Sequence, residues 1–344
     1  MGKSLLGERI NELDYIRGFA LLGIILVNVI AMLLIDLPEN HTIDASYQRF
    51  LYLFVEGRFY TIFSFLFGVG FYIFLTRANS KGRNGYLLLL SRLIVLFIIG
   101  FVHSLFLDGE VLRFYAICGL LALPFYKLNK HINLGISIIL LIVLSYFGLK
   151  ITLSLPLILL GLSAGQYGVF ENLSKRTKKL TIFTLAMLVL SVISLFVQYQ
   201  YIPESPFANI ILMGDDDDAI NQTNLFLKIG VANGTIISAF YIGLLLLLLQ
   251  TKIIRKLLAP LKYYGRMALT NYIGQTVLIM GCSLIFNLEG KLTYIQTIYI
   301  CIAICTIQIV FSMVWLRIFK FGPLEWIWRI LTYWKWMPLT KKTT

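Results

Sequence analysis

The sequence predicts an all-α protein, a polytopic integral membrane protein with about ten transmembrane helices. Of its 344 residues, 58% are hydrophobic and only 14% are charged, whereas a soluble domain carries about 25% charged residues. Apolar runs long enough to cross about 30 Å of hydrocarbon recur along the chain. Basic residues gather in every second connection between these runs, as expected of cytoplasmic loops. We therefore expect the lipid bilayer, rather than water, to surround most of the chain.

The expected spans follow from the apolar runs, because a helix needs roughly 20 apolar residues to cross the bilayer. The first run, from Phe19 to Ile35, is longer than the apolar part of a signal peptide and lacks a clear cleavage site, so we expect it to remain as the first span. Residues 1–316 should form one helical bundle, followed by a cytoplasmic tail at 317–344. The expected spans are 15–35, 59–77, 86–107, 111–127, 132–149, 151–168, 180–200, 226–249, 263–286 and 293–316.

The charges of the connecting loops predict the orientation of these spans. One set of loops is basic and contains Arg77, Lys81 and Arg83; Lys127 and Lys130; Lys175, Arg176, Lys178 and Lys179; Lys252, Arg255, Lys256 and Lys262. The alternating set is acidic and contains Asp36, Glu39 and Asp44; Asp108 and Glu110; Asp215 to Asp218. With an even number of spans, the positive-inside rule places both termini in the cytoplasm. The basic loops also account for the net charge of +13, so we expect no nucleic-acid partner.

The tail after the last span predicts an amphipathic helix at the membrane interface. Four of the five Trp residues lie in it, and amphipathic aromatic rings favour the headgroup layer. Pro323 is suited to the first turn of such a helix. Glu325 and Arg329 are spaced to pair at i,i+4.

The cysteines and the known metal motifs give no sign of a metal site. Cys118, Cys282, Cys301 and Cys305 each lie within an apolar run, where cysteine is a small packing residue. The sequence contains no zinc motif, phosphate-binding Gly-rich loop or nucleophile elbow. We therefore expect no bound metal.

Two of the expected spans carry polar residues at the same spacing. Arg17 is followed eleven positions later by Asn28, and Arg92 eleven positions later by His103. Eleven residues return to within about 20° of the starting direction and rise about 16 Å, so each pair shares one helix face. Ionisable groups at membrane depth are candidates for function. The alternative is structural, since either Arg could extend its head group to the interface and Asn28 could bond a neighbouring helix.

His103 is the strongest candidate for chemistry among these residues. A short connection with Asp108, Glu110 and Arg113 follows it. A carboxylate beside an imidazole fixes its tautomer and raises its basicity, as a general base requires. We expect Asp108 to have this role.

Other polar residues could contact a substrate. Glu56 and Arg58 precede the second span at its outer mouth, and Asn271 and Gln275 share one face of the ninth span. For Asn271 and Gln275, hydrogen bonds between helices are an equally good explanation.

Several of these segments resemble the YeiB-like bacterial membrane proteins, also called domain of unknown function 418. The matching segments are Leu13-Asp14-Tyr15-Ile16-Arg17-Gly18 with Asn28, Glu56-Gly57-Arg58-Phe59, Gly265-Arg266-Met267-Ala268-Leu269-Thr270-Asn271-Tyr272, and Gly322-Pro323-Leu324-Glu325-Trp326. They span nearly the whole chain in the expected order. The resemblance implies a multi-pass protein of the bacterial cell membrane.

The chain is similar in turn to the wider acyltransferase-3 superfamily, whose members transfer acyl groups from acyl-CoA to extracytoplasmic sugars and envelope polymers. Those enzymes use an Arg and a His at the spacing of Arg92 and His103, whereas the first span has Asn28 in place of His. An amide is no general base, so either His103 has the catalytic role or the chemistry is absent. If the chain is such an acyltransferase, we expect Arg17 and Arg92 to hold the phosphates of acetyl-CoA or a longer acyl-CoA. Arg58 or Arg113 would stabilise charge on the acceptor, a glycan or lipid-linked molecule, or on the tetrahedral oxyanion.

Two other functions remain open from the sequence. The parallel placement of the two Arg-containing faces hints at an internal repeat, which is common in transporters and flippases. A structural or partner-binding membrane protein is the third possibility.

Overall fold

The computed structural model describes residues 9–148, 150–208 and 218–341, and within these it is a bundle of helices. The run Asp215 to Asp217 lies outside the described residues, and Asp218 begins a helix. The one β-type pairing in the described part is an isolated bridge between Phe319 and Thr340. The elements are α2 (Asn11–Met32), α3 (Ile43–Phe54), α4 (Arg58–Ser80), α5 (Gly85–His103), α6 (Leu112–Ala122), η1 (Leu123–Lys127), α7 (Lys130–Tyr146), η2 (Lys150–Leu153), α8 (Ser154–Gln166), η3 (Leu173–Arg176), α9 (Thr177–Tyr199), α10 (Asp218–Leu248), α11 (Lys252–Leu257), α12 (Ala259–Arg266), α13 (Ala268–Phe286), α14 (Thr297–Ile318) and α15 (Pro323–Tyr333).

The lengths of these helices agree with a multi-pass membrane protein. Seven segments of the described chain are long and apolar enough to cross a membrane, namely Asn11–Met32, Ile43–Ser80, Gly85–His103, Leu173–Tyr199, Asp218–Leu248, Ala268–Phe286 and Thr297–Ile318. The expected spans at 111–127, 132–149 and 151–168 are formed by shorter helices, α6 with η1, α7, and η2 with α8. The number of ten spans and the side of each terminus therefore stay predictions.

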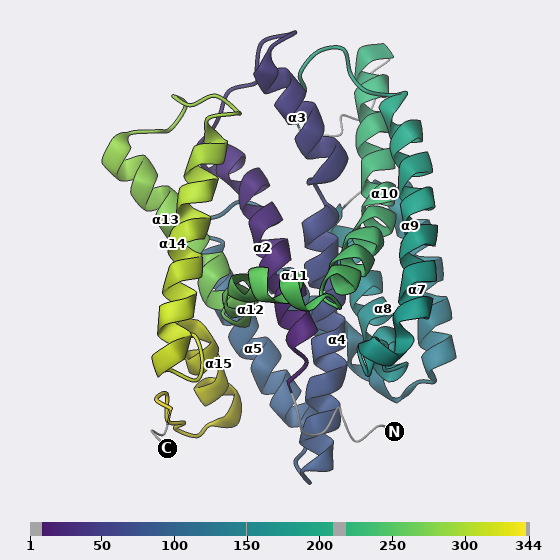
Figure 1. Ribbon diagram of the computed structural model, residues 1–344, viewed down its shortest axis with the longest axis vertical. Helices are drawn as coiled ribbons and strands as arrows, with labels where there is room; N and C mark the ends of the chain where they lie inside the picture. Colours follow the sequence, from purple (N-terminus) through teal and green to yellow (C-terminus); the bar gives the residue numbers. More distant parts are fainter. Residues whose placement is uncertain (1–8, 149, 209–217, 342–344) are drawn as a thin grey trace.

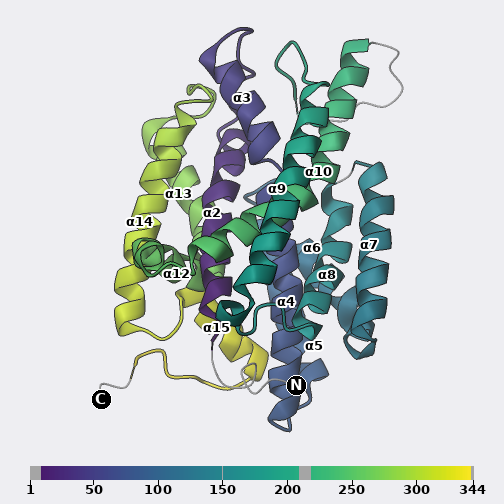
Figure 2. The same ribbon diagram turned by 45° about the vertical axis from the view of Figure 1, so that its right-hand side comes forward.

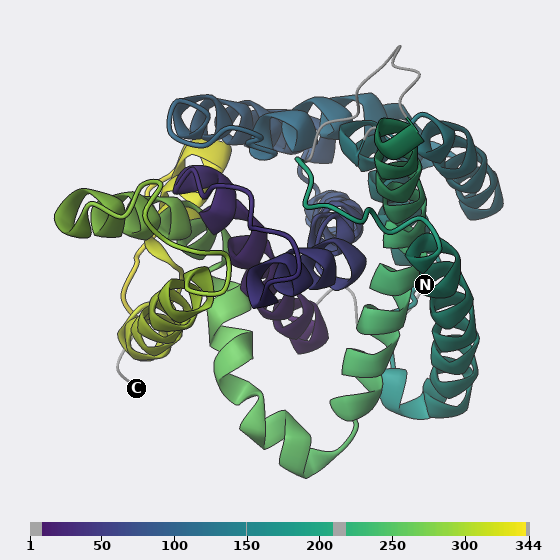
Figure 3. The same cartoon turned by 90° about the horizontal axis from the view of Figure 1, so that it is seen from above.

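Two helices lie at the centre of the bundle, α2 and α4, and the others surround them (Figure 1, Figure 3). Glycines allow close contact between α4 and its neighbour α8. A Cβ at Gly68 of α4 would lie 1.9 Å from the carbonyl oxygen of Ile158 in α8, and one at Gly161 of α8 would lie 2.0 Å from that of Phe65. Small residues of this kind let membrane helices approach each other's backbones.

The span expected at 263–286 is present as α13 (Ala268–Phe286), but it begins later than predicted, because residues 263–266 belong to the separate helix α12. The backbone of Met267 (φ −107°, ψ 38°) leaves the helical region and separates α12 from α13. The break leaves backbone N–H groups at the start of α13 without partners in their own helix. The Glu325 carboxylate accepts from two of them, the N–H of Leu269 at 2.8 Å and that of Thr270 at 3.1 Å.

The helix expected in the tail is present as α15, and it begins at Pro323. Its partner differs from the expectation, because Glu325 binds α13 instead of pairing with Arg329, whose guanidinium lies 4.4 Å from the centre of the Phe321 ring. The Nε1–H of Trp328 donates to the Arg92 carbonyl of α5 at 2.9 Å. These hydrogen bonds hold α15 against α5 and α13, at the end of the bundle where α2 begins (Figure 2).

Candidate active site

A cavity of about 500 Å³ lies between α2, α4, α5, α13 and α15. Its lining follows the chain from Arg9 through the first half of α2 to Ile24, and α5 from Leu88 to Leu96, so it extends from one end of the bundle deep into the interior. Its inner wall is formed by residues of α6 and α13 that include Leu112, Tyr115 and Tyr272.

The end of the cavity nearest the start of α2 is strongly cationic. Its basic lining residues are Arg9, Arg17, Arg77, Lys81, Arg83, Arg92, Arg266, Lys320 and Arg329. The acidic lining residues are Asp14 and Glu325, and both are engaged by protein groups. Asp14 bonds Arg9 at 2.8 Å and Arg17 at 3.1 Å, and Glu325 accepts from α13. The excess of positive charge fits a polyanionic ligand.

Burial acts on the charged groups of this cavity that lie on α12 and α15. It lowers the pKa of the Arg329 and Arg266 guanidinium groups, and the positive charge of Arg9 lowers both further. Burial also raises the pKa of the Glu325 carboxyl, although hydrogen bonds from Leu269 and Thr270 oppose that shift. A bound anion would offset the repulsion among these cations.

Arg92 is the best-positioned cation in the cavity. Its guanidinium stacks 3.8 Å from the centre of the Trp328 ring and 5.0 Å from that of Phe74. Within the described residues it forms no ion pair with a carboxylate. Since stacking uses the faces of the guanidinium plane, its N–H groups remain directed along the edges, where a phosphate can bind.

The inner half of the cavity is apolar and aromatic. It is lined by Ile24, Phe63, Leu66, Phe67 and Leu96. A ligand that fits the whole cavity therefore has an anionic head and an apolar end, with the apolar end directed at Tyr115 and Tyr272.

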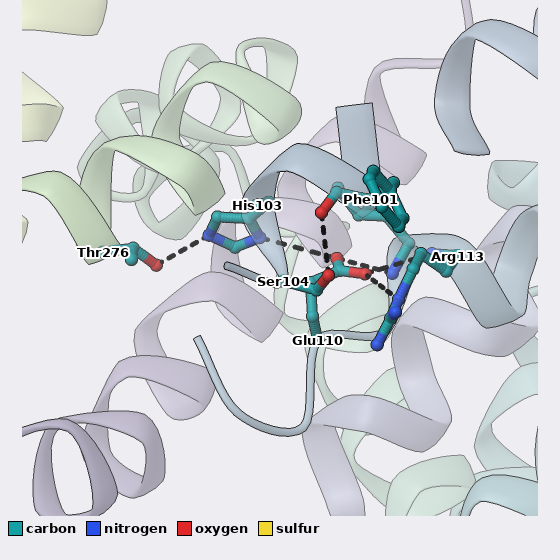
Figure 4. A network of polar contacts seen from close by, with 7 residues as sticks. Phe101, His103, Ser104, Glu110, Arg113 and Thr276 are labelled. Carbon is teal, nitrogen blue, oxygen red and sulfur yellow. Dashed lines mark hydrogen bonds and ion pairs between the residues drawn. The ribbon is translucent and has the colours of Figure 1, made fainter. Parts of the chain in front are cut away.

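His103 lies directly behind this inner wall and does not line the cavity itself. Its ring makes an edge-to-face contact with Tyr272, with the ring centres 5.1 Å apart. The imidazole is 4% exposed, and Figure 4 shows it between Glu110 and Thr276. Nδ1 lies 3.5 Å from Glu110 Oε1, and Nε2 lies 2.9 Å from the Thr276 hydroxyl oxygen.

The carboxylate that contacts His103 is Glu110 and not Asp108, which is exposed. Glu110 is fully buried and accepts from the backbone N–H of Leu112 at 2.7 Å and of Arg113 at 3.1 Å. The Arg113 guanidinium lies 3.9 Å from the same carboxylate. The first turn of α6 and the Arg113 guanidinium thus hold the Glu110 carboxylate in place beside the imidazole.

The remaining candidate residues lie away from the cavity lining. Asn28 is half-buried on α2 and makes no side-chain hydrogen bond within the described residues. Glu56 forms an ion pair with Lys150. Arg58 is 1% exposed and donates to the carbonyls of Glu56 and Gly230 and to the Gln198 side chain.

Asn271 and Gln275 take part in hydrogen bonds between helices. Asn271 Nδ2 donates to the Tyr264 carbonyl at 2.8 Å and to the Ser312 hydroxyl at 2.9 Å. Gln275 Nε2 donates to the Leu21 carbonyl at 3.1 Å and to the Tyr264 hydroxyl at 2.8 Å. These contacts join α13 to α2, α12 and α14 just behind the site.

The structure adds residues that the sequence did not single out. Thr276, Tyr272 and Trp328 complete the site, and the basic residues of the α4–α5 connection and of α12 and α15 line its cationic end. The sequence shows Thr276 only as a polar residue four positions after Tyr272, and nothing in it predicts the contact with His103. Within the described part of the chain, no three His, Cys, Asp or Glu side chains form a group that could hold a metal ion.

Comparison with known proteins gives two family matches. Residues 164–335 match the family described as "Protein of unknown function (DUF418)". Residues 9–214 match the family described as "Heparan-alpha-glucosaminide N-acetyltransferase, catalytic". The second match includes Arg17, Arg92, His103 and Glu110, and the first includes Thr276 and Trp328.

Full-length relatives match over nearly the whole chain. An "uncharacterized 39.9 kDa protein in amylase 3'region" of Bacillus acidopullulyticus is 56% identical, over 98% of this chain and 97% of the relative. The uncharacterized protein YxaH of Bacillus subtilis (strain 168) is 27% identical, over 99% and 98%. The uncharacterized protein YeiB of Escherichia coli (strain K12) is 28% identical, over 98% and 100%.

Proposed function

The chain belongs to the YeiB-like DUF418 family, and we propose that it is a membrane acyltransferase that moves an acyl group from cytoplasmic acyl-CoA to a hydroxyl of an extracytoplasmic acceptor. The observation that carries this proposal is a cavity, cationic at one end and apolar at the other, that ends at Tyr115 and Tyr272, with the buried pair His103–Glu110 directly behind Tyr272. The match of residues 9–214 to an N-acetyltransferase catalytic region supports the same chemistry.

The donor fits the two halves of the cavity. Coenzyme A carries phosphates at one end, which Arg92 and Arg17 would bind through charge-assisted hydrogen bonds. Its thioester arm would lie along the apolar half and bring the acyl carbon to Tyr115 and Tyr272. A volume of about 500 Å³ lies within the range of about 300–1,000 Å³ found for small-molecule sites.

His103 is the group that would handle the proton in the transfer. A side-chain rotation of Tyr272 would open the cavity to the imidazole, since the two rings are in contact. His103 is also the last residue of α5, at the end remote from Arg92. The acceptor, a cell-envelope glycan or a lipid-linked sugar in the plasma membrane, would therefore approach from the opposite side. Arg113 would offer positive charge to the acceptor or to the developing oxyanion.

The first experiment measures binding and turnover of acetyl-CoA and of a long-chain acyl-CoA by the purified protein in lipid nanodiscs. Arg92→Ala should weaken binding about tenfold or more, because charged hydrogen bonds contribute about 1.5–3 kcal/mol. His103→Gln should keep binding and lose CoA release by about 10²-fold or more, the typical contribution of general acid–base catalysis.

Two matched controls make this test specific. Lys178→Ala removes a basic residue that is exposed at the start of α9, and His131→Gln changes an exposed histidine of α7 whose Nδ1 bonds the Tyr167 hydroxyl. Neither residue lines the cavity, so both variants should behave as the unchanged protein. Equal binding by Arg92→Ala and Lys178→Ala, or full turnover by His103→Gln, contradicts the proposal.

A transporter or flippase for an anionic envelope metabolite is the second candidate. The cavity supports it, because it is cationic at one end and closed at the other by Tyr115 and Tyr272, as a transport site open to one side of the membrane would be. Uptake or scrambling of an anionic substrate in proteoliposomes without acyl-CoA, together with no binding of acyl-CoA, would favour transport.

A further inference from the structure

The hydroxyl of Thr276 is directed at His103 and not at its own helix. Threonines within helices commonly donate to the carbonyl four residues earlier, as Thr61, Thr184 and Thr332 do here at 2.9, 2.8 and 2.7 Å. Thr276 instead places its hydroxyl oxygen 2.9 Å from His103 Nε2. Thr276 is only 2% exposed, so this bond is shielded from solvent.

The surroundings of Glu110 determine the direction of this hydrogen bond. The Glu110 carboxylate accepts from the backbone N–H groups of Leu112 and Arg113, and the Arg113 guanidinium lies 3.9 Å from it. Both oxygens of this carboxylate act as acceptors, so we assign the hydrogen to the imidazole nitrogen that faces it, Nδ1. In the neutral imidazole Nε2 is then the acceptor, and the Thr276 hydroxyl donates to it.

Thr276, His103 and Glu110 therefore form a hydroxyl–imidazole–carboxylate series. This is the arrangement in which a base activates a hydroxyl nucleophile while a third group orients the base. The three residues come from α13, the end of α5 and the connection to α6, and Figure 4 shows them in line.

Thr276 lies close to the inner end of the cavity, between the cavity and the end of α5 that carries His103. Tyr272, which lines the cavity, lies four residues before Thr276 on the same face of α13. Four residues correspond to a rise of about 6 Å along a helix. The hydroxyl is thus one helical turn beyond the inner end of the cavity, on the side of the His103 ring.

We propose that Thr276 is the nucleophile that carries the acyl group between donor and acceptor, an inference that rests on the proposed acyltransferase function. In the first step, the Thr276 oxygen forms a bond to the thioester carbonyl while His103 Nε2 accepts the hydroxyl proton. The carbon–sulfur bond then breaks, and the departing CoA thiolate takes that proton as free CoA. An acyl ester remains on Thr276.

The second step reverses the roles of the same groups. The hydroxyl of the acceptor attacks the ester carbonyl, and His103 accepts the acceptor's proton. The bond between the carbonyl carbon and the Thr276 oxygen breaks, and His103 returns the proton to Thr276. A covalent step of this kind lets donor and acceptor use the buried site one after the other, although they arrive from opposite sides of the membrane.

The experiment treats the purified protein in nanodiscs with acetyl-CoA and no acceptor, then measures released CoA and locates the acetyl group by peptide mass spectrometry. We expect about one equivalent of CoA for each active protein, the burst that marks a covalent intermediate, and an acetyl ester on Thr276. Thr276→Val should still bind acetyl-CoA while losing both the burst and the adduct. Thr276→Ser should retain them.

Thr184→Val is the matched control, because it removes a buried hydroxyl of α9 that, within the described residues, donates to the Leu180 carbonyl of its own helix. It should release CoA as the unchanged protein does. Turnover retained by Thr276→Val, or an acetyl group found on His103, would overturn the covalent role of Thr276 and leave the proposed acyltransferase intact. Failure of the unchanged protein to bind any acyl-CoA would overturn both.

Discussion

At the scale of single residues, the connection after α5 shows why the carboxylate partner of His103 could not be identified from the sequence. Asp108 and Glu110 both follow His103 closely, and only the backbone between them separates their roles. Gly109 adopts a left-handed conformation with φ 78°, which glycine tolerates readily. The chain turns there, so that Asp108 faces outward and Glu110 is fully buried. Thr276 was beyond prediction for another reason, since it lies 173 positions from His103.

Replacing each carboxylate by its amide shows which of the two, Glu110 or Asp108, supports turnover. Glu110→Gln replaces the carboxylate that accepts from His103 Nδ1, so turnover should fall by about 10²-fold, the lower end of the contribution of general acid–base catalysis. Asp108→Asn should leave turnover unchanged, because Asp108 is exposed and does not contact His103. Steady-state rates and acetyl-CoA affinity measured side by side test this. A loss confined to Asp108→Asn would restore the role expected from the sequence.

At the scale of secondary-structure elements, α15 was predictable as a helix and not as part of the site. Pro323 and the amphipathic pattern after it predicted its start and its character. The position of α15 depends on Glu325. The helix break at Met267 leaves the N–H groups of Leu269 and Thr270 without partners in their own helix, and the Glu325 carboxylate accepts hydrogen bonds from both. Hydropathy did not locate that break, because α12 ends at Arg266 and α13 begins at Ala268, with only Met267 between them.

The docking of α15 predicts that Trp328 contributes to donor binding. Replacement by Leu removes the ring that stacks on Arg92 and the bond to the Arg92 carbonyl. Cation–π contacts contribute about 0.5–2 kcal/mol, so acyl-CoA affinity should fall by about 2- to 30-fold. Trp336→Leu is the control, because Trp336 is 74% exposed and lies outside the cavity lining. Titration of both variants with acetyl-CoA checks this, and equal affinities would remove Trp328 from the site.

At the scale of the whole molecule, hydropathy indicates where the chain is apolar but not what covers each helix. α8 and α9 are both apolar; α8 is largely buried against α4, whereas much of α9 is exposed on the outside of the bundle. A helix face that contacts lipid and one that contacts another helix are both composed of apolar residues. The sequence therefore predicted a bundle of helices, but not that α2 and α4 lie at its centre. The cavity depends on that pair, because α2 and α4 supply much of its wall.

The cavity itself can be tested by filling it. Gly70 of α4 lines it, and an added Cβ there would meet only Arg17, 3.6 Å away, whereas one at Gly68 would meet backbone at 1.9 Å. Gly70→Trp should therefore fold, judged by its thermal unfolding, and should lose acyl-CoA binding because the indole occupies the donor's path. Gly281→Trp, in open space on α13 and outside the lining, should bind normally. Undiminished binding by a folded Gly70→Trp variant would place the donor elsewhere, since an occupied cavity of this size has no room for both groups.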